Sequence, residues 1–87
     1  MEPKTETESE KQERVDAINA AHLANSGEHI AQFFAFAHLP PHLAVVSRPF
    51  TTAAVKVLEL PRNPERTVAL RKLLEAKDAA VRAVVAK

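Results

Sequence analysis

The last part of the chain, residues 60–87, has one uninterrupted helical pattern with a marked start. Asn63 is a favourable N-cap, Pro64 suits the first helical position, and Glu65 favours the positive end of the helix dipole. Because no proline or glycine follows Pro64, the pattern predicts one helix over residues 63–86. A chain of only 87 residues must organise its remaining elements around a helix of this length.

One side of this predicted helix is apolar. At about 100° per residue, the apolar arc covers roughly half of the helix circumference. It is formed by Ala69, Leu70, Leu73, Leu74, Ala76, Ala80, Val81, Val84 and Val85. Arg66 and Lys77 fall inside this arc. Either their aliphatic stems lie along the apolar face with the charges in water, or each cation meets a negative group there.

The opposite side of the helix has the pattern of a solvated face. Two pairs of opposite charge stand four residues apart, Arg71 with Glu75 and Asp78 with Arg82. A stripe of mostly small residues, which overlaps the arc, permits close approach of a second helix, either within the subunit or from a second one. The stripe is formed by Ala69, Leu73, Ala76, Ala80 and Ala83.

The chain before this helix divides into an acidic tail and further helical segments. Residues 1–8 are polar and without periodicity, so we expect a disordered lead-in, followed by one helical domain over residues 9–87. Ser9 can cap a first helix together with Gln12, and its apolar face would carry Val15, Ile18 and His22. Gly27, the only glycine, indicates either a C-cap or a kink.

Prolines divide the middle of the chain. An apolar stretch over residues 30–37 is predicted to continue as helix until Leu39-Pro40-Pro41 ends it. Its three phenylalanines, and Phe50 beyond them, are expected in the core. Ser47 followed by Pro49 predicts the start of another helix over residues 47–60, which Pro61 stops. The short connection at 61–62 then places the last two helices in an antiparallel hairpin, so the fold class is all-α.

Length and composition restrict the class of protein. A domain of 87 residues has a small core, so we expect a homo-oligomer. The chain has no cysteine, no apolar run of transmembrane length and no signal-peptide core, which predicts a soluble intracellular protein without membrane contact. Residues 17–87 contain nine Lys and Arg against five acids, a surplus of four. Such a surplus suits a small anionic ligand better than duplex nucleic acid, which requires a denser basic stripe.

The usual signs of catalysis are missing from the sequence. One glycine excludes a Gly-rich phosphate loop, there is no Cys nucleophile, and the serines are explained as caps or turn residues. We therefore expect that the protein has no catalytic activity and binds no cofactor. His38 and His42 have a zinc-like spacing, but Pro40 and Pro41 between them prevent a helix, so no metal site is expected. Without Trp or Tyr, the chain also has little with which to stack the bases of a single strand.

Residues 64–76, PERTVALRKLLEA, followed by Ala80, Arg82 and Ala83, resemble the C-terminal helix of the phage anti-CBASS/anti-Thoeris hairpin-domain family. The family pattern there is Glu-Arg-Ser/Thr-x-Ala-Leu-x-Lys-Leu-x-Glu-Ala and then a small-residue stretch. Residues 33–41, Phe50 and Leu60-Pro61 look like the preceding helix and turn of that hairpin, so the resemblance covers residues 30–86.

The resemblance implies a sponge in the host cytoplasm. Such a protein is a homo-oligomer, in anti-CBASS members a hexamer, that sequesters a cyclic oligonucleotide immune messenger without cleaving it. Under this interpretation Arg66, Thr67, Arg71 and Lys72 line a pocket between subunits and bind phosphodiester groups. Arg66→Ala is then expected to abolish ligand binding and to leave the fold and the oligomer intact. The alternative is that Glu65 and Arg66 only complete the helix start.

The N-terminal half departs from the family pattern. Anti-CBASS members have a Tyr and a Lys that serve a cyclic-dinucleotide pocket, whereas this chain has His22 in place of that Lys and no Tyr. His22 is thus the candidate ligand contact in this half, and a cyclic trinucleotide, a dinucleotide or another messenger stays open. A different class of function also fits the residues, a non-catalytic helical scaffold or protein-interaction module without a nucleotide ligand.

Overall fold

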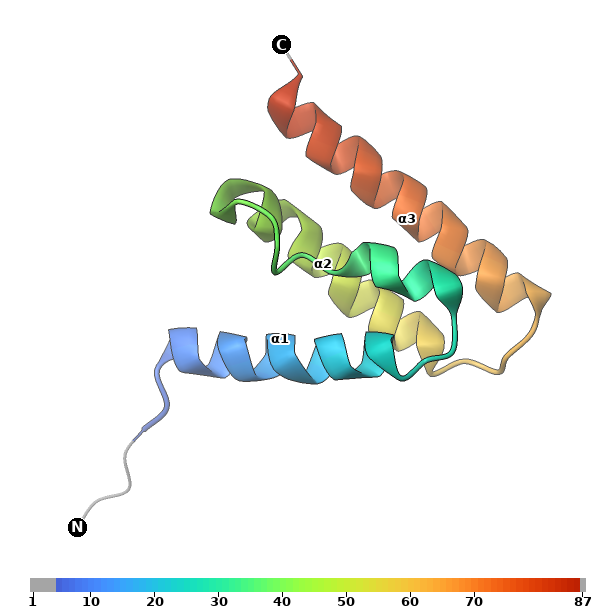
Figure 1. Ribbon diagram of the computed structural model, residues 1–87, viewed down its shortest axis with the longest axis horizontal. Coiled ribbons are helices and arrows are strands. Elements are labelled where there is room, and N and C mark those ends of the chain that lie inside the picture. The colour runs from blue at the N-terminus through green and yellow to red at the C-terminus, as the bar shows by residue number, and fades with distance from the viewer. Residues whose placement is uncertain (1–4, 87) are drawn as a thin grey trace.

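The computed structural model describes residues 5–86, and in this range it contains helices and no strand. Three α-helices, α1 (Glu8–Ala24), α2 (Pro41–Leu58) and α3 (Pro64–Val85), are joined by turns and by a short 3₁₀ helix, η1 (His29–Phe34). The predicted all-α class is therefore confirmed. Figure 1 shows α2 and α3 running side by side in opposite directions, with α1 across the C-terminal end of α2.

The start of α3 is the one predicted from the sequence. The Asn63 side chain accepts a hydrogen bond of 2.9 Å from the Arg66 backbone N–H, and Pro64 occupies the first helical position. This arrangement satisfies one of the free donors at the helix start and needs no N–H from proline. The helix ends at Val85, within a residue of the predicted boundary.

The core lies where η1 meets the three α-helices. Its buried apolar residues are Leu23, Ile30, Ala31, Phe34, Ala54, Val55 and Leu70. The apolar arc predicted for α3 is only partly covered. Leu70 is fully buried, whereas Val84 and Val85 near the end of α3 are 45% and 56% exposed. The C-terminal end of α3 projects past the other helices (Figure 1).

Helix α1 begins earlier than predicted and buries a different face. Glu8 already belongs to α1, and the cap is Thr7, whose hydroxyl accepts from the Glu10 backbone N–H at 3.1 Å. Helix α1 thus includes Glu8, the last residue of the tail predicted over residues 1–8, and the first four residues of that tail lie outside the described part of the chain. Asn19 and Leu23 are buried, whereas Ile18 is 47% exposed and His22 is exposed.

The predicted helix over residues 30–37 was wrong. The chain leaves α1 through Asn25 and turns at Gly27, whose φ of 73° favours glycine. The following helical segment is η1, a 3₁₀ helix that ends at Phe34. The Thr51 hydroxyl donates to the Phe34 carbonyl and so satisfies an acceptor that a longer helix would use internally.

The four phenylalanines also differ from one another in burial. Phe34 is fully buried, Phe50 packs against the core from a half-buried position, and Phe33 is 48% exposed. Phe36 lies under the Arg48 guanidinium, with 5.2 Å from Cζ to the ring centroid. The expectation was therefore wrong for Phe33 and Phe36, because neighbouring residues of a 3₁₀ helix point to different sides and Phe36 lies beyond the end of η1.

Helix α2 begins at Pro41, not at Ser47, and continues through Pro49. Pro41 suits a helix start because its missing N–H has no partner there in any case. Pro49 removes one hydrogen bond to Val45, which is 62% exposed on the solvent side. Ser47 and Thr51 are buried on either side of Pro49, so packing before and after the proline offsets this loss.

Candidate functional site

Three of the predicted site residues lie together on the exposed side of α3. Thr67, Arg71 and Lys72, with Val68, line a shallow surface hollow of about 280 Å³, here named the α3 hollow. Two cations and a hydroxyl within two helical turns provide several donors for one anionic group. All four residues belong to a single helix, so the α3 hollow has only one wall in the subunit.

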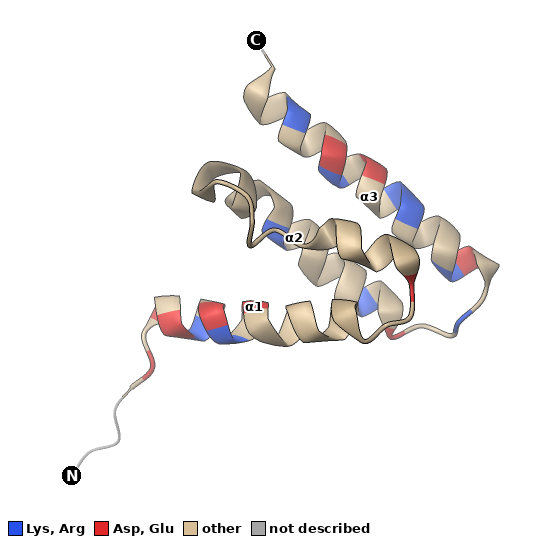
Figure 2. Ribbon diagram, viewed as in Figure 1, with Lys and Arg blue, Asp and Glu red and all other residues tan. Residues whose placement is uncertain are grey.

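The charges around the α3 hollow pair differently from the sequence prediction. Lys72 Nζ lies 3.8 Å from a Glu75 carboxylate oxygen, and Asp78 pairs with Lys77 at 3.1 Å. Within residues 5–86, neither Arg71 nor Arg82 forms an ion pair. Arg71 therefore keeps its guanidinium free for an external acceptor. Figure 2 shows both signs of charge distributed along α3, with no continuous basic stripe.

Arg66 lies away from solvent, at the corner where three segments meet. Its side chain is 8% exposed, and one terminal nitrogen, Nη2, donates to a Glu28 carboxylate oxygen at 2.7 Å. The other, Nη1, donates to the carbonyls of Leu58 and Leu60, each at 3.1 Å. These contacts, named here the Arg66 clamp, tie the start of α3 to the end of α2 and to the residue before η1.

The Arg66 clamp explains how a cation is accommodated on the apolar arc of α3. The negative group that Arg66 meets is the chain's own Glu28, which is itself 11% exposed on its side chain. Arg66 Nε is buried without a hydrogen-bond partner in the described residues. A bound phosphate is therefore not needed to explain why Arg66 lies on the apolar arc, because the internal carboxylate and two carbonyls already compensate the buried charge.

Lys77, the second cation on the arc, is held in the same way. Its Nζ donates to the Phe33 carbonyl at 2.8 Å and pairs with Asp78, while the side chain is 12% exposed. Lys77 therefore attaches the end of η1 to the middle of α3. Neither cation of the arc has its charge mainly in water.

His22 does not join the other predicted site residues. It lies on α1 and lines a separate small hollow with Ser26, Val55 and Glu59, at the end of α2. The α3 hollow contains no residue of α1. Within one subunit, the structure thus brings together Thr67, Arg71 and Lys72, and separates them from both His22 and Arg66.

Sequence reasoning missed a second polar cluster, around Arg48. Arg48 Nε donates to the Asp16 carboxylate at 3.2 Å and 3.3 Å, and Gln12 donates to the same carboxylate at 2.8 Å. Arg48 and Asp16 are separated by 32 residues, and no motif or periodicity links them. In the sequence, only their opposite charges suggest a pair. Every acid and base in the chain shares this property, so it does not identify Arg48 and Asp16 as partners.

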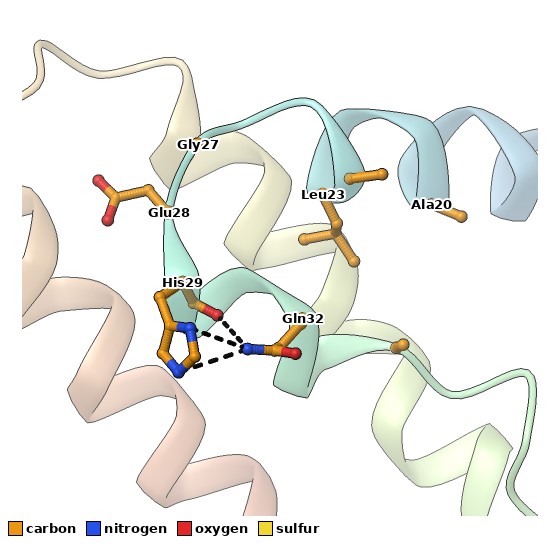
Figure 3. Close-up of a pocket in the computed structure, with 8 residues that line it drawn as sticks. Ala20, Leu23, Gly27, Glu28, His29 and Gln32 are labelled. Atoms are coloured by element: carbon orange, nitrogen blue, oxygen red, sulfur yellow. Dashed lines mark hydrogen bonds between the residues drawn. The ribbon is translucent and has the colours of Figure 1, made fainter.

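Asp16 and Arg48 stand at one end of an apolar groove beside α1. Two hollows, of about 410 Å³ and 510 Å³, share Ala20, Leu23 and Ala35 and together form what we name the α1 groove. Figure 3 shows its other end, where the Gln32 amide contacts the His29 ring and carbonyl. The Glu28 side chain points away from Gln32 in this view, in agreement with its ion pair to Arg66 on α3.

Among residues 5–86, no group of three His, Cys, Asp or Glu side chains lies close enough to hold a metal ion. No helix in this same range combines the length and apolar content needed to cross a bilayer. No protein-family model, curated protein or solved structure matches the chain.

Proposed function

We propose that this chain is a non-catalytic sponge that binds and sequesters a cyclic oligonucleotide messenger, a trinucleotide or a dinucleotide, of CBASS-type or Thoeris-type defence. The single observation that supports it is the grouping of Thr67, Arg71 and Lys72 in the α3 hollow. The class of ligand comes from the resemblance of residues 30–86 to the phage hairpin-domain family. The α3 hollow provides the hydrogen-bond donors for such a ligand, since a guanidinium, an ammonium and a hydroxyl all donate to phosphodiester oxygens.

The proposal requires an assembly of subunits in the host cytoplasm. A hollow with one wall leaves most of a cyclic oligonucleotide in water, so a second copy has to supply the opposite wall. The antiparallel pair α2–α3 would be the hairpin that assembles, and the family resemblance suggests a hexamer. In this proposal Arg66 has a structural role, and Arg71 replaces it as the main phosphate contact, because Arg71 is exposed and has no carboxylate partner in the described residues.

The direct test is capture and release of intact ligand. The full chain is incubated with a panel of cyclic di- and trinucleotides, filtered, and heated, and the released nucleotide is identified by chromatography. We expect depletion of one or more messengers and their recovery unchanged. Hydrolysed product would indicate an enzyme, and absence of depletion across the panel would contradict the sponge.

A matched pair of variants tests the site itself. Arg71→Ala combined with Lys72→Ala removes both cations of the α3 hollow and should weaken binding by about 3 kcal/mol, from the loss of two charge-assisted contacts. Arg82→Ala, an exposed arginine near the end of the same helix, is the control and should bind as the unaltered protein does. Equal affinity of the double variant and the control would remove the α3 hollow as the ligand site.

A second candidate function is a helical scaffold that binds protein and no nucleotide. The observation that favours it is the exposure of Val84 and Val85 on the projecting end of α3. Exposed apolar residues in one place favour association with another protein surface. The nucleotide panel separates the two functions, because a scaffold depletes no messenger. Light scattering of the unaltered chain and of Val84→Glu then measures whether the end of α3 takes part in association.

A further inference from the structure

The α1 groove is not part of the proposed sponge site, and it has the features of a small-molecule site. Its two hollows are each of several hundred Å³ and meet at Ala20, Leu23 and Ala35. Ligand pockets in proteins have this order of volume, a mainly apolar lining and a few polar groups that fix orientation. The groove stays open because the facing segments present alanine, whose methyl group is too short to fill the space between them.

The polar groups of the groove are distributed unequally between its ends. At one end Arg48 pairs with Asp16, with Nη2 3.2 Å from a carboxylate oxygen, and lies over the Phe36 ring. At the other end the groove is lined by the uncharged Gln32 amide and the His29 ring, which contact each other. Glu28 lines this end too, but its carboxylate is bound by Arg66. The one guanidinium that lines the groove therefore lies at a single end, beside Asp16.

Some N–H donors of Arg48 are not used within the described residues. Within residues 5–86 the Arg48 guanidinium has only Asp16 as a polar partner, through Nε and Nη2, so the Nη1 N–H groups have no protein acceptor. A guanidinium presents five N–H donors in a fixed planar arrangement and binds a carboxylate through two of them. The Arg48 side chain is 31% exposed, so an external anion can reach it from the groove mouth.

We propose that the α1 groove binds an amphiphile with one carboxylate at the end of an apolar chain. The carboxylate would lie on Arg48, and the chain would run along Ala20 and Leu23 toward Gln32. The groove residues of α1 extend from Asp16 to Ala24, a helical length of about 12 Å, which suits a medium-length aliphatic chain. A ligand with carboxylates at both ends fits less well, because neither Lys nor Arg is among the residues that line the Gln32 end.

The ion pair between Arg48 and Asp16 predicts that Asp16 competes with the ligand carboxylate for Arg48. A ligand carboxylate has to share Arg48 with Asp16, so the Asp16 charge opposes binding. Asp16→Asn keeps the shape and the acceptor oxygen while it removes the negative charge. This variant should therefore bind the amphiphile more tightly than the unaltered protein, which a purely apolar groove would not do.

Fluorescence titration of the full chain with dansylundecanoate, an apolar chain that ends in a carboxylate, tests the proposal. We expect saturable binding, about tenfold weaker in Arg48→Gln and several-fold tighter in Asp16→Asn, as expected for a charge-assisted contact. Ala20→Phe fills the groove from an exposed helical position and should abolish binding without unfolding α1. Lys56→Gln, an exposed cation on the same helix as Arg48, is the matched control and should bind as the unaltered chain does. Circular dichroism verifies that every variant is folded.

The methyl ester of the same probe separates charge from apolar contact. The ester should bind at least about tenfold more weakly than the acid to the unaltered chain, and equally weakly to Arg48→Gln. No binding of the acid, or binding that Ala20→Phe leaves unchanged, would overturn the site. Equal affinity for acid and ester, or an Asp16→Asn variant no tighter than the unaltered chain, would overturn the role of Arg48.

Discussion

The two ends of α3 have opposite surroundings, although the sequence makes both part of one amphipathic helix. Near its start, Arg66 is 8% exposed and Leu70 is fully buried. Near its end, Val84 and Val85 are 45% and 56% exposed. A charged arginine is thus better buried than two valines on the same helix. The comparison teaches that burial along α3 follows the position of neighbouring segments, and not the hydrophobicity of each residue.

The physical cause of this difference in burial is which neighbouring segments lie beside each end of α3. At the start, the carbonyls at the end of α2 and the Glu28 carboxylate converge on Arg66 and compensate its desolvation. At the end, α3 has passed beyond the other described helices, so the described residues leave the valines exposed (Figure 1). The predictions below test this difference, beginning with the largest effect.

Arg66→Ala should lower the free energy of unfolding by about 4 kcal/mol, because it leaves Glu28 buried without its partner and two carbonyls without a donor. Urea denaturation followed by circular dichroism measures the change. The matched control is Arg71→Ala on the exposed side of α3, for which we expect a change below about 0.5 kcal/mol. This outcome is the reverse of the one expected from the sequence, in which Arg66→Ala leaves the fold intact.

A double variant sharpens the same prediction. Arg66→Met with Glu28→Gln removes both charges and keeps the approximate side-chain volumes, so it should be more stable than Arg66→Met alone. Additive losses from Arg66→Met and Glu28→Gln would show that the two residues do not interact, and would disprove the Arg66 clamp.

Leu70→Ala should cost about 3 kcal/mol, since it leaves a cavity where η1, α2 and α3 meet. Val84→Ala on the same helix should change stability by less than about 0.5 kcal/mol, because an exposed valine loses few contacts. Thermal unfolding of the two variants in parallel measures the contrast. Similar losses would mean that the two ends of α3 are covered alike in solution, as they would be inside an oligomer.

Asn63→Ala should cost about 1 kcal/mol, since the Arg66 backbone N–H loses the side-chain acceptor that caps α3. Asn63→Asp retains an acceptor at the same position and should be as stable as the unaltered chain. Equal stability of all three proteins in urea would show that the Arg66 clamp alone determines the helix start.

Ala76→Glu should have the smallest effect on folding, below about 0.5 kcal/mol, because Ala76 is exposed in the subunit. If the small-residue stripe of α3 packs against a second copy, the same substitution places a charge in that contact and disperses the oligomer. Light scattering of the unaltered chain and of Ala76→Glu measures the assembly. A monomeric unaltered chain, or an Ala76→Glu oligomer of unchanged size, would exclude this stripe as the subunit contact.

Local signals in the sequence were sufficient for α3 and misleading for the middle of the chain. Asn63, Pro64 and Glu65 mark a helix start through contacts within a few residues, so the start could be predicted. Ser47 and Pro49 carry the same kind of signal, yet both lie inside α2. A proline at the helix start and a proline within a packed helix look alike in sequence, and only the burial of Ser47 and Thr51 distinguishes them.

The candidate sites divide in the same way. The neighbours Thr67, Arg71 and Lys72 share an exposed helical face, which periodicity alone can predict. The partners of Arg66 and Arg48 could not be predicted, because Glu28 and Asp16 lie 38 and 32 residues away along the chain. Charge pairs at such separations depend on how the helices are arranged.

The amino-acid sequence by itself determined the all-α class, the limits of α3 and the position of Arg66 and Lys77 on an apolar arc. Each of these follows from helical periodicity or from hydrogen bonds that span a few residues. The tertiary structure alone decided that η1 is a short 3₁₀ helix, that α2 runs through Pro49, and that Arg66 is buried against Glu28. The reason is that these features depend on contacts between segments distant in sequence, whose free energies outweigh local preferences.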